Sequence, residues 1–141
     1  MFRFFFIFLI TVGTRLSCTT AQIGGFTMIK SVERVTHQAF ETDEISKVRF
    51  NIDPDIIEVR STRSSRVLVE TTIEMNSPSM PLLEYAISIG RYELEAVVED
   101  GVMTITPRPR THAIIIKGKE IKENLKYMIM IPEVLKQTPG L

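Results

Sequence analysis

Alternating apolar and polar residues predict strands over most of the chain. In residues 67–74, "VLVETTIE", β-branched residues occupy every second position, which is typical of a strand with one buried face. Residues 127–131, "YMIMI", are apolar throughout and predict a strand buried on both faces. Further strands are predicted at 32–40, 48–52, 57–60, 92–98, 102–106 and 113–117.

Turn residues separate these segments. Asp53-Pro54-Asp55 is typical of a turn, because proline presets φ and aspartate caps nearby amides. Glu99-Asp100-Gly101 predicts a hairpin turn, since glycine accepts positive φ at little cost. Residues 61–65 form a polar turn, "PRPR" at 107–110 ends a strand, and 118–124 is a charged connection.

One short helix is predicted at about 81–90. Ser79 and Pro81 are start signals and Gly90 is a stop signal. Apolar residues between them recur at helical spacing: Leu82, Leu83, Ala86 and Ile87. The alternative is a strand with three apolar residues on one face: Tyr85, Ile87 and Ile89. The predicted fold class is all-β, a β-sandwich or a β-helix-like antiparallel sheet, with one short helix.

The first 21 residues predict a secretory signal peptide. Arg3 precedes an apolar run over 4–12, too short for a bilayer-spanning helix of about 20 residues. Small residues at Thr19 and Ala21 predict cleavage between Ala21 and Gln22. A buried N-terminal strand is the alternative. The predicted destination is the periplasm, the outer envelope or the extracellular space.

Residues 22–31 predict a flexible leader, and residues 32–141 a single β-rich domain. The sequence ends after a Thr-Pro-Gly turn, as if another strand should follow. This pattern leaves open whether the native protein extends beyond Leu141 and the domain is truncated.

Cys18 has two interpretations. A bacterial lipoprotein signal resembles Leu-small-small-Cys; Ser17 fits that pattern, whereas Arg15 and Leu16 do not. We therefore expect Cys18 to leave with the signal peptide, which excludes disulfides and thiol catalysis in the exported chain. In the alternative, Cys18 is lipidated and holds the chain to a membrane as a subunit of an envelope assembly.

Charge and aromatic content argue against a nucleic-acid partner. The chain has 17 Lys+Arg and 17 Asp+Glu, and residues 22–141 carry a net charge of −2. A nucleic-acid-binding protein would normally show a basic surface. Outside the first segment there are three Phe, three Tyr and no Trp, few for a stacking surface.

The candidate metal ligands are not clustered in the sequence. His37 and His112 are far apart and have no ligand at metal-like spacing. Asn51, Asp53 and Asp55 have the alternating spacing of a calcium loop, but Ile56 stands where glycine is needed, so a turn is the better interpretation. We predict no metal site and no cofactor.

The remaining charged groups have surface interpretations. Arg60, Arg63 and Arg66 border a turn and would hold an anionic partner or, more simply, be solvated. Glu93, Glu95 and Glu99 are expected on the wet face of a strand. No nucleophile elbow or glycine-rich phosphate loop is present, so we predict no catalytic residues and no small-molecule substrate.

Several segments together resemble the secreted head GIN-type adhesin family of Gram-negative bacteria: "VRFNIDPDIIEVRS", "RVLVETTIE", "ELEAVVEDGVMTITP" and "LKYMIMIPEVLKQTPG". A hairpin of the type found at 100–105 and a strand ending in proline at 128–132 recur in that family. The resemblance implies an all-β fold, export and no catalytic residues.

The leading functional hypothesis is an exported, non-catalytic β module, adhesin-like or envelope-associated. It would act on another protein or an envelope surface through a sheet face or an open edge strand. The alternatives are a small periplasmic enzyme or metal-binding protein built on carboxylates and one histidine, and the lipid-anchored subunit described above.

Overall fold

A computed structural model describes residues 30–137 and confirms an all-β fold with one short helix. Its elements are β1 Val32–Glu41, β2 Lys47–Phe50, the 3-10 turn η1 Pro54–Ile56, β3 Ile57–Thr62, β4 Arg66–Met75, α1 Met80–Ser88, β5 Leu94–Glu99, β6 Val102–Pro107, β7 Ile115–Ile116, β8 Lys119–Glu120, β9 Glu123–Pro132 and β10 Lys136–Gln137. The predicted cleavage site at Ala21 and Gln22, and Cys18, lie outside the described residues.

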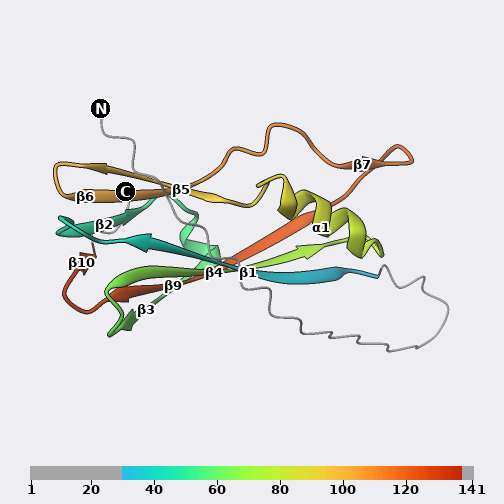
Figure 1. Ribbon diagram of the computed structural model, residues 1–141. Helices are drawn as coiled ribbons and strands as arrows, with labels where there is room; N and C mark the ends of the chain where they lie inside the picture. The colour runs from blue at the N-terminus through green and yellow to red at the C-terminus, as the bar shows by residue number, and fades with distance from the viewer. Residues whose placement is uncertain (1–29, 138–141) are drawn as a thin grey trace.

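Eight of the described strands form two four-stranded sheets that face each other as a sandwich (Figure 1), and β7 and β8 pair separately as a two-stranded sheet. Sheet A has the order β1-β4-β9-β3, and sheet B has the order β10-β2-β6-β5. The expected antiparallel pairing holds for β1–β4, β4–β9 and β5–β6, whereas β3–β9, β2–β6 and β10–β2 are parallel. Of the two predicted architectures, the structure has the sandwich.

The alternating pattern of β4 explains how sheet A packs. Val67, Val69, Ile73 and Met75 are all buried and lie on one face of the sheet. Val67 and Val69 belong to the core between the two sheets, with contributions from sheet B such as Ile105. Burial of side chains of this size stabilises the fold by about 1.5–3 kcal/mol each.

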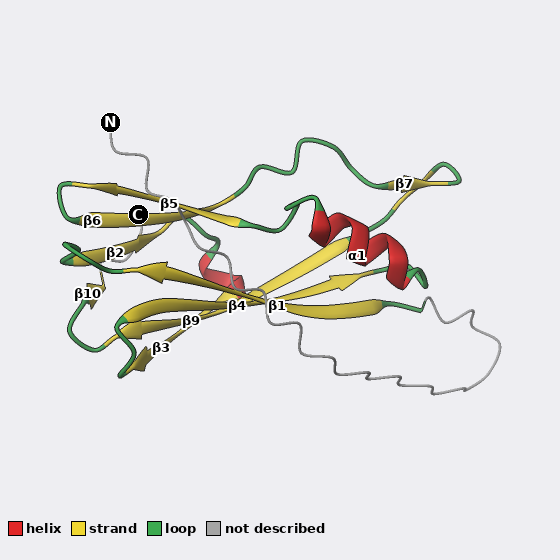
Figure 2. Ribbon diagram, viewed as in Figure 1, coloured by secondary structure: helices red, strands yellow, loops and turns green. Residues whose placement is uncertain are grey.

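The far end of β4 is covered by α1 instead of sheet B (Figure 2). Ile73 and Met75 pack there against Leu83 and Ala86 of the helix. The predicted helix is thus confirmed: the hydroxyl of Ser79 accepts a hydrogen bond from the Leu82 amide, and Pro81 lies in the first turn. Within residues 30–137, no helix is long and apolar enough to cross a bilayer.

The helix ends in a Schellman motif at Gly90. The amide of Gly90 donates to the carbonyl of Ile87, and the amide of Arg91 donates to the carbonyl of Ala86. Gly90 has φ of +74°, a left-handed conformation that glycine adopts without steric cost. The stop signal predicted at this position is confirmed. Because of the turn that follows the helix, the next strand begins only at Leu94.

Two predictions for the second half of the chain are wrong. The connection predicted at 118–124 contains β8 and the first residues of β9, which begins at Glu123 because its polar residues pair with β4. Met128 and Met130 are only partly buried. They lie on the outer face of sheet A, which no other described element covers, so β9 is buried on one face only.

Candidate functional site

The first four residues of β9 have a neighbouring strand on one side only. β4 pairs with β9 from Glu123 to Met130, whereas β3 pairs with it only from Tyr127 onward. The uncovered stretch is therefore 123–126. We call it the open edge of β9.

Hydrogen bonds on either side show which peptide groups face this open edge. The Asn76 amide donates to the carbonyl of Lys122 on the β4 side, and the Glu133 amide donates to the carbonyl of Thr62 on the β3 side. Because peptide groups alternate in direction along a strand, those of Glu123 and Leu125 point away from β4. They are the backbone donors and acceptors that a further strand would use.

A groove of about 700 Å³ follows the open edge. Its outer part is lined by residues on the solvent face of sheet A, among them Glu70 and Thr72 of β4. Its inner part is lined by Leu125 and Tyr127, together with Ile56 of η1. An adjoining cavity of about 140 Å³ reaches between the ends of sheet B and shares four lining residues with the groove: Ile56, Arg110, Leu125 and Tyr127.

At one end of the groove, Glu123 is held by two side chains from the segment after α1. Arg91 donates from Nε to Glu123 Oε1 at 2.7 Å and from Nη2 to Oε2 at 2.8 Å. The Tyr92 hydroxyl donates to Oε1 at 2.5 Å. The side chains of Arg91 and Glu123 are only 13% and 8% exposed. This bidentate geometry fixes where the chain leaves α1 relative to β9.

The charges of this cluster shift its pKa values in opposite directions. Burial acts to raise the pKa of Glu123, but hydrogen bonds from Arg91 and Tyr92 outweigh it, so that pKa lies below its ordinary value. Burial, and then the hydrogen bond to Glu123, raises the pKa of Tyr92. The hydrogen bond to Glu123 raises the pKa of Arg91. At neutral pH the cluster is a closed ion pair with a neutral phenol.

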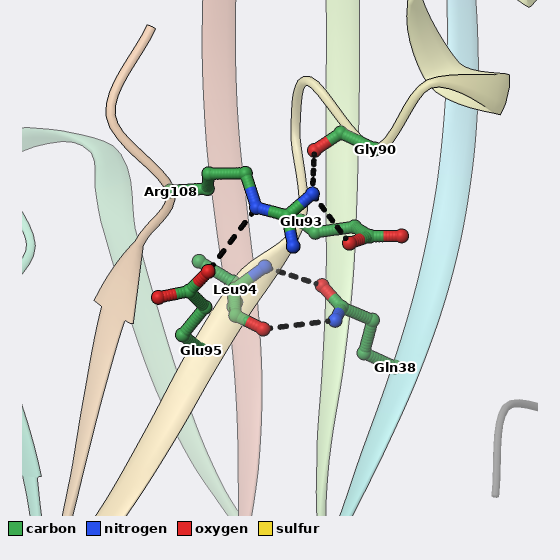
Figure 3. A network of polar contacts seen from close by, with 6 residues as sticks. All are labelled: Gln38, Gly90, Glu93, Leu94, Glu95 and Arg108. Atoms are coloured by element: carbon green, nitrogen blue, oxygen red, sulfur yellow. Dashed lines mark hydrogen bonds and ion pairs between the residues drawn. The ribbon is translucent and has the colours of Figure 1, made fainter. Parts of the chain in front are cut away.

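A second polar network borders the smaller cavity (Figure 3). Arg108, in the loop after β6, contacts Glu93 at 3.1 Å and Glu95 at 3.1 Å, and donates to the carbonyl of Gly90 at 3.4 Å. Glu93 and Glu95, which were predicted on the wet face of a strand, thus take part in an ion-pair network. Its members are half-exposed, so each pair contributes roughly 0–1 kcal/mol.

The side chain of Gln38 in β1 forms hydrogen bonds with β5, the edge strand of sheet B. Its amide nitrogen donates to the carbonyl of Leu94 at 3.2 Å, and its amide oxygen accepts from the Leu94 amide at 2.9 Å (Figure 3). The Arg108 amide bonds the Glu93 carbonyl on the β6 side, so the peptide groups of Leu94 face outward by alternation. Gln38 therefore takes the place of a neighbouring strand at that position.

We expect Gln38→Ala to lower the free energy of unfolding by about 1–2 kcal/mol, because two partly buried hydrogen bonds are lost. Urea unfolding at neutral pH measures this. Gln38→Glu is the matched variant: it keeps the acceptor for the Leu94 amide but has no donor for the carbonyl, and it should also destabilise. Equal stability of all three proteins would contradict the role given to Gln38.

The residues singled out in the sequence are mostly dispersed. His37 lies 3.2 Å from Glu70 on the outer face of sheet A, whereas His112 is exposed in the loop before β7. Within residues 30–137, no three His, Cys, Asp or Glu side chains gather as a metal ion would require. Asp53 accepts from the Asp55 amide and caps η1, as the turn interpretation predicted.

The arginines around the 61–65 turn do not converge on one site. Arg60 pairs with Glu58, and Arg66 pairs with Glu41. Arg63 is exposed.

The sequence pattern did not predict the residues that shape the groove. Glu123 lies in a run of mixed charges that predicted a solvated connection. Arg91 lies between the predicted helix and the next predicted strand, and Arg110 lies in the "PRPR" segment that was predicted to end a strand. The one signal in the sequence was the position of Glu123. It lies two residues before Leu125, and the alternation of the following apolar residues therefore places it on the inner face of the same strand. Its partners are 32 and 31 residues away in the chain and could not be found locally.

No protein-family model, curated protein or solved structure matches this chain.

Proposed function

We propose that this chain is an exported, non-catalytic β module that binds a partner protein by accepting an extended segment along the open edge of β9. The observation that carries this proposal is the combination of strand positions 123–126, which have a neighbouring strand on one side only, with a groove of about 700 Å³ beside them. Addition of a strand to a sheet edge gives affinity through the backbone and specificity through side-chain pockets.

The dimensions suit a short segment. At about 3.3 Å per residue, the four positions of the open edge span roughly 13 Å. The peptide groups of Glu123 and Leu125 supply backbone hydrogen bonds. The side chains of Ile56 and Leu125 on one side and Met128 on the other supply apolar contacts.

The groups beside the groove support binding over catalysis. Both carboxylate oxygens of Glu123 accept hydrogen bonds from Arg91 and Tyr92, so three of the roughly four lone-pair positions of that carboxylate are already occupied. His37 and Glu70 lie on the open face of sheet A, where each side chain is partly exposed. A binding surface needs neither group to be activated.

Selection of random displayed peptides against the purified protein tests this proposal. We expect enriched peptides to bind the wild-type protein and to bind Thr72→Arg at least tenfold more weakly, because the new side chain fills the groove. Thr104→Arg is the matched control, since Thr104 is a partly buried threonine on β6 of the other sheet. Binding to this control should not change.

Synthetic peptides with N-methyl groups at alternate residues test the backbone mechanism. Methylation in one register should abolish binding and methylation in the other should not, because only every second amide of an added strand faces β9. The proposal would be overturned if no peptide is enriched. Equal binding to the wild-type protein and Thr72→Arg would also overturn it.

A further inference from the structure

Tyr127 combines a buried ring with an unsatisfied hydroxyl. The residue is 3% exposed and belongs to the core between the sheets. Within residues 30–137, its hydroxyl makes no hydrogen bond, and the one enclosed side-chain nitrogen or oxygen without a partner is Nδ1 of His37. The Tyr127 hydroxyl must therefore reach accessible space, and Tyr127 lines both the groove and the smaller cavity.

Arg110 is the charged residue that lines both cavities together with Tyr127. It lies in the exposed loop after β6. Burial raises the pKa of Tyr127, and the positive charge of Arg110 acts against that rise. Among the described residues, Arg110 makes no hydrogen bond or ion pair, unlike Arg91 and Arg108.

Glu123 does not neutralise Arg110. The charge of Arg110 contributes to the lowered pKa of Glu123, so the two groups sense each other. However, three hydrogen bonds from Arg91 and Tyr92 already bind the Glu123 carboxylate. Arg110 and the Tyr127 hydroxyl, which belong to residues that line both cavities, thus have hydrogen-bond donors that no other described residue uses.

We infer that Tyr127 and Arg110 form a binding site for a single carboxylate of the bound segment. The inference rests on the proposed function, because it assigns the chemical class of one group of the segment that lies along β9. A planar carboxylate accepts two parallel hydrogen bonds from a guanidinium, and a phenol adds a third. The source is an acidic side chain or the C-terminal carboxylate of the partner.

The surrounding charges favour a monoanion over a phosphate. Asp55 and Glu123 line the groove near the junction, and Asp53 and Glu93 line the smaller cavity. A dianion would face twice the repulsion from these carboxylates that a carboxylate faces. The outer groove, with Glu58 and Glu70, would then receive a neutral or basic part of the segment.

Titration of the protein with defined probes, followed by NMR of the tyrosine rings, tests the inference. The probes are acetyl-Val-Glu-Val-amide, acetyl-Val-Gln-Val-amide, acetyl-Val-Val-Val with a free carboxylate, its amide, and methyl phosphate. We expect the two carboxylate peptides to shift the Tyr127 signals and to bind at least tenfold more tightly than their amides. Whichever carboxylate binds more tightly identifies the source.

Two variants separate this role from a structural one. Arg110→Gln should abolish the preference for the carboxylate peptides. Tyr127→Phe should weaken carboxylate binding severalfold yet leave the melting temperature unchanged, because the hydroxyl has no described protein partner to lose. Tyr92→Phe is the contrasting control, since it removes the hydrogen bond to Glu123 and should lower the melting temperature.

Failure of the carboxylate site and failure of the edge-binding function give different results. If the amide and carboxylate peptides bind equally and both are lost in Thr72→Arg, the carboxylate site is overturned and the edge-binding function stands. If methyl phosphate binds more tightly than either carboxylate, or no carboxylate shifts the Tyr127 signals, the carboxylate site is likewise overturned. Loss of peptide selection at the groove overturns the proposed function instead.

Discussion

Replacing Glu123 with alanine should lower the free energy of unfolding by about 3–5 kcal/mol, the usual cost of leaving one member of a buried ion pair alone. Arg91 would keep its charge with a side chain only 13% exposed, and the Tyr92 hydroxyl would lose its acceptor. Urea unfolding at neutral pH, followed by circular dichroism, measures the change.

A double variant tests whether the unpaired charge of Arg91 causes this loss of stability. Removing both charges with Arg91→Met and Glu123→Leu should destabilise less than Glu123→Ala alone, because no uncompensated charge remains. Glu123→Gln should lie between them, since it retains an acceptor for Tyr92. If the double variant were the least stable protein, the cost would come from lost packing and not from the unpaired cation.

The difference in unfolding free energy between the wild-type protein and Glu123→Ala should depend on pH. The folded-state pKa of Glu123 lies below its unfolded value, which is about 4.3. The stability contributed by the carboxylate is therefore complete above the unfolded pKa and is lost as the pH falls through the folded pKa. The gap between wild type and Glu123→Ala should consequently narrow on acidification; a gap that widens would contradict this assignment.

Replacing Gly90 with alanine should lower the free energy of unfolding by about 1–3 kcal/mol. A left-handed conformation costs a residue with a Cβ roughly 1–2 kcal/mol. In addition, a Cβ at this position would lie 2.6 Å from Arg108 Nη1 and 2.8 Å from the carboxyl group of Glu93. Arg108 would have to move and weaken its contacts with Glu93 and Gly90, at a cost of up to about 1 kcal/mol.

Gly118 provides the matched control. Its φ is +75°, nearly equal to that of Gly90, but a Cβ there would meet nothing within 4 Å. Gly118→Ala should therefore cost only the conformational part, about 1–2 kcal/mol. The difference between the two costs should disappear when both substitutions are compared in a protein that also carries Arg108→Ala and Glu93→Ala, because both side chains that the Cβ would meet are then truncated. Thermal unfolding of the four variants measures these values, and equal costs at the two glycines would rule out the steric part.

The fold was predictable where the signals are local. Alternation located β4, Asp100-Gly101 located the β5–β6 hairpin, and Ser79 with Gly90 bounded α1, because each feature depends on neighbouring residues. The parallel pairs β3–β9 and β2–β6 were not predictable, since register between distant strands is set by packing in three dimensions.

The candidate site was largely hidden from the sequence for the same reason. Apolar residues at 128 and 130 looked like core residues, although they face outward, because periodicity alone cannot tell whether the second face of a sheet is covered. The groove exists because β3 begins opposite Tyr127 and not opposite Glu123. That offset is a property of two strands that are separated by most of the domain.

The position of β9 also constrains when the domain can fold. This strand lies between β4 and β3 in sheet A but comes after both in the chain. Its two neighbours cannot join each other without it, so the sheet must wait until residue 132 has left the ribosome. Contacts between segments so distant in sequence also make folding slow. A newly made chain would thus spend an interval with its apolar strands exposed, and in that interval it is a substrate for chaperones.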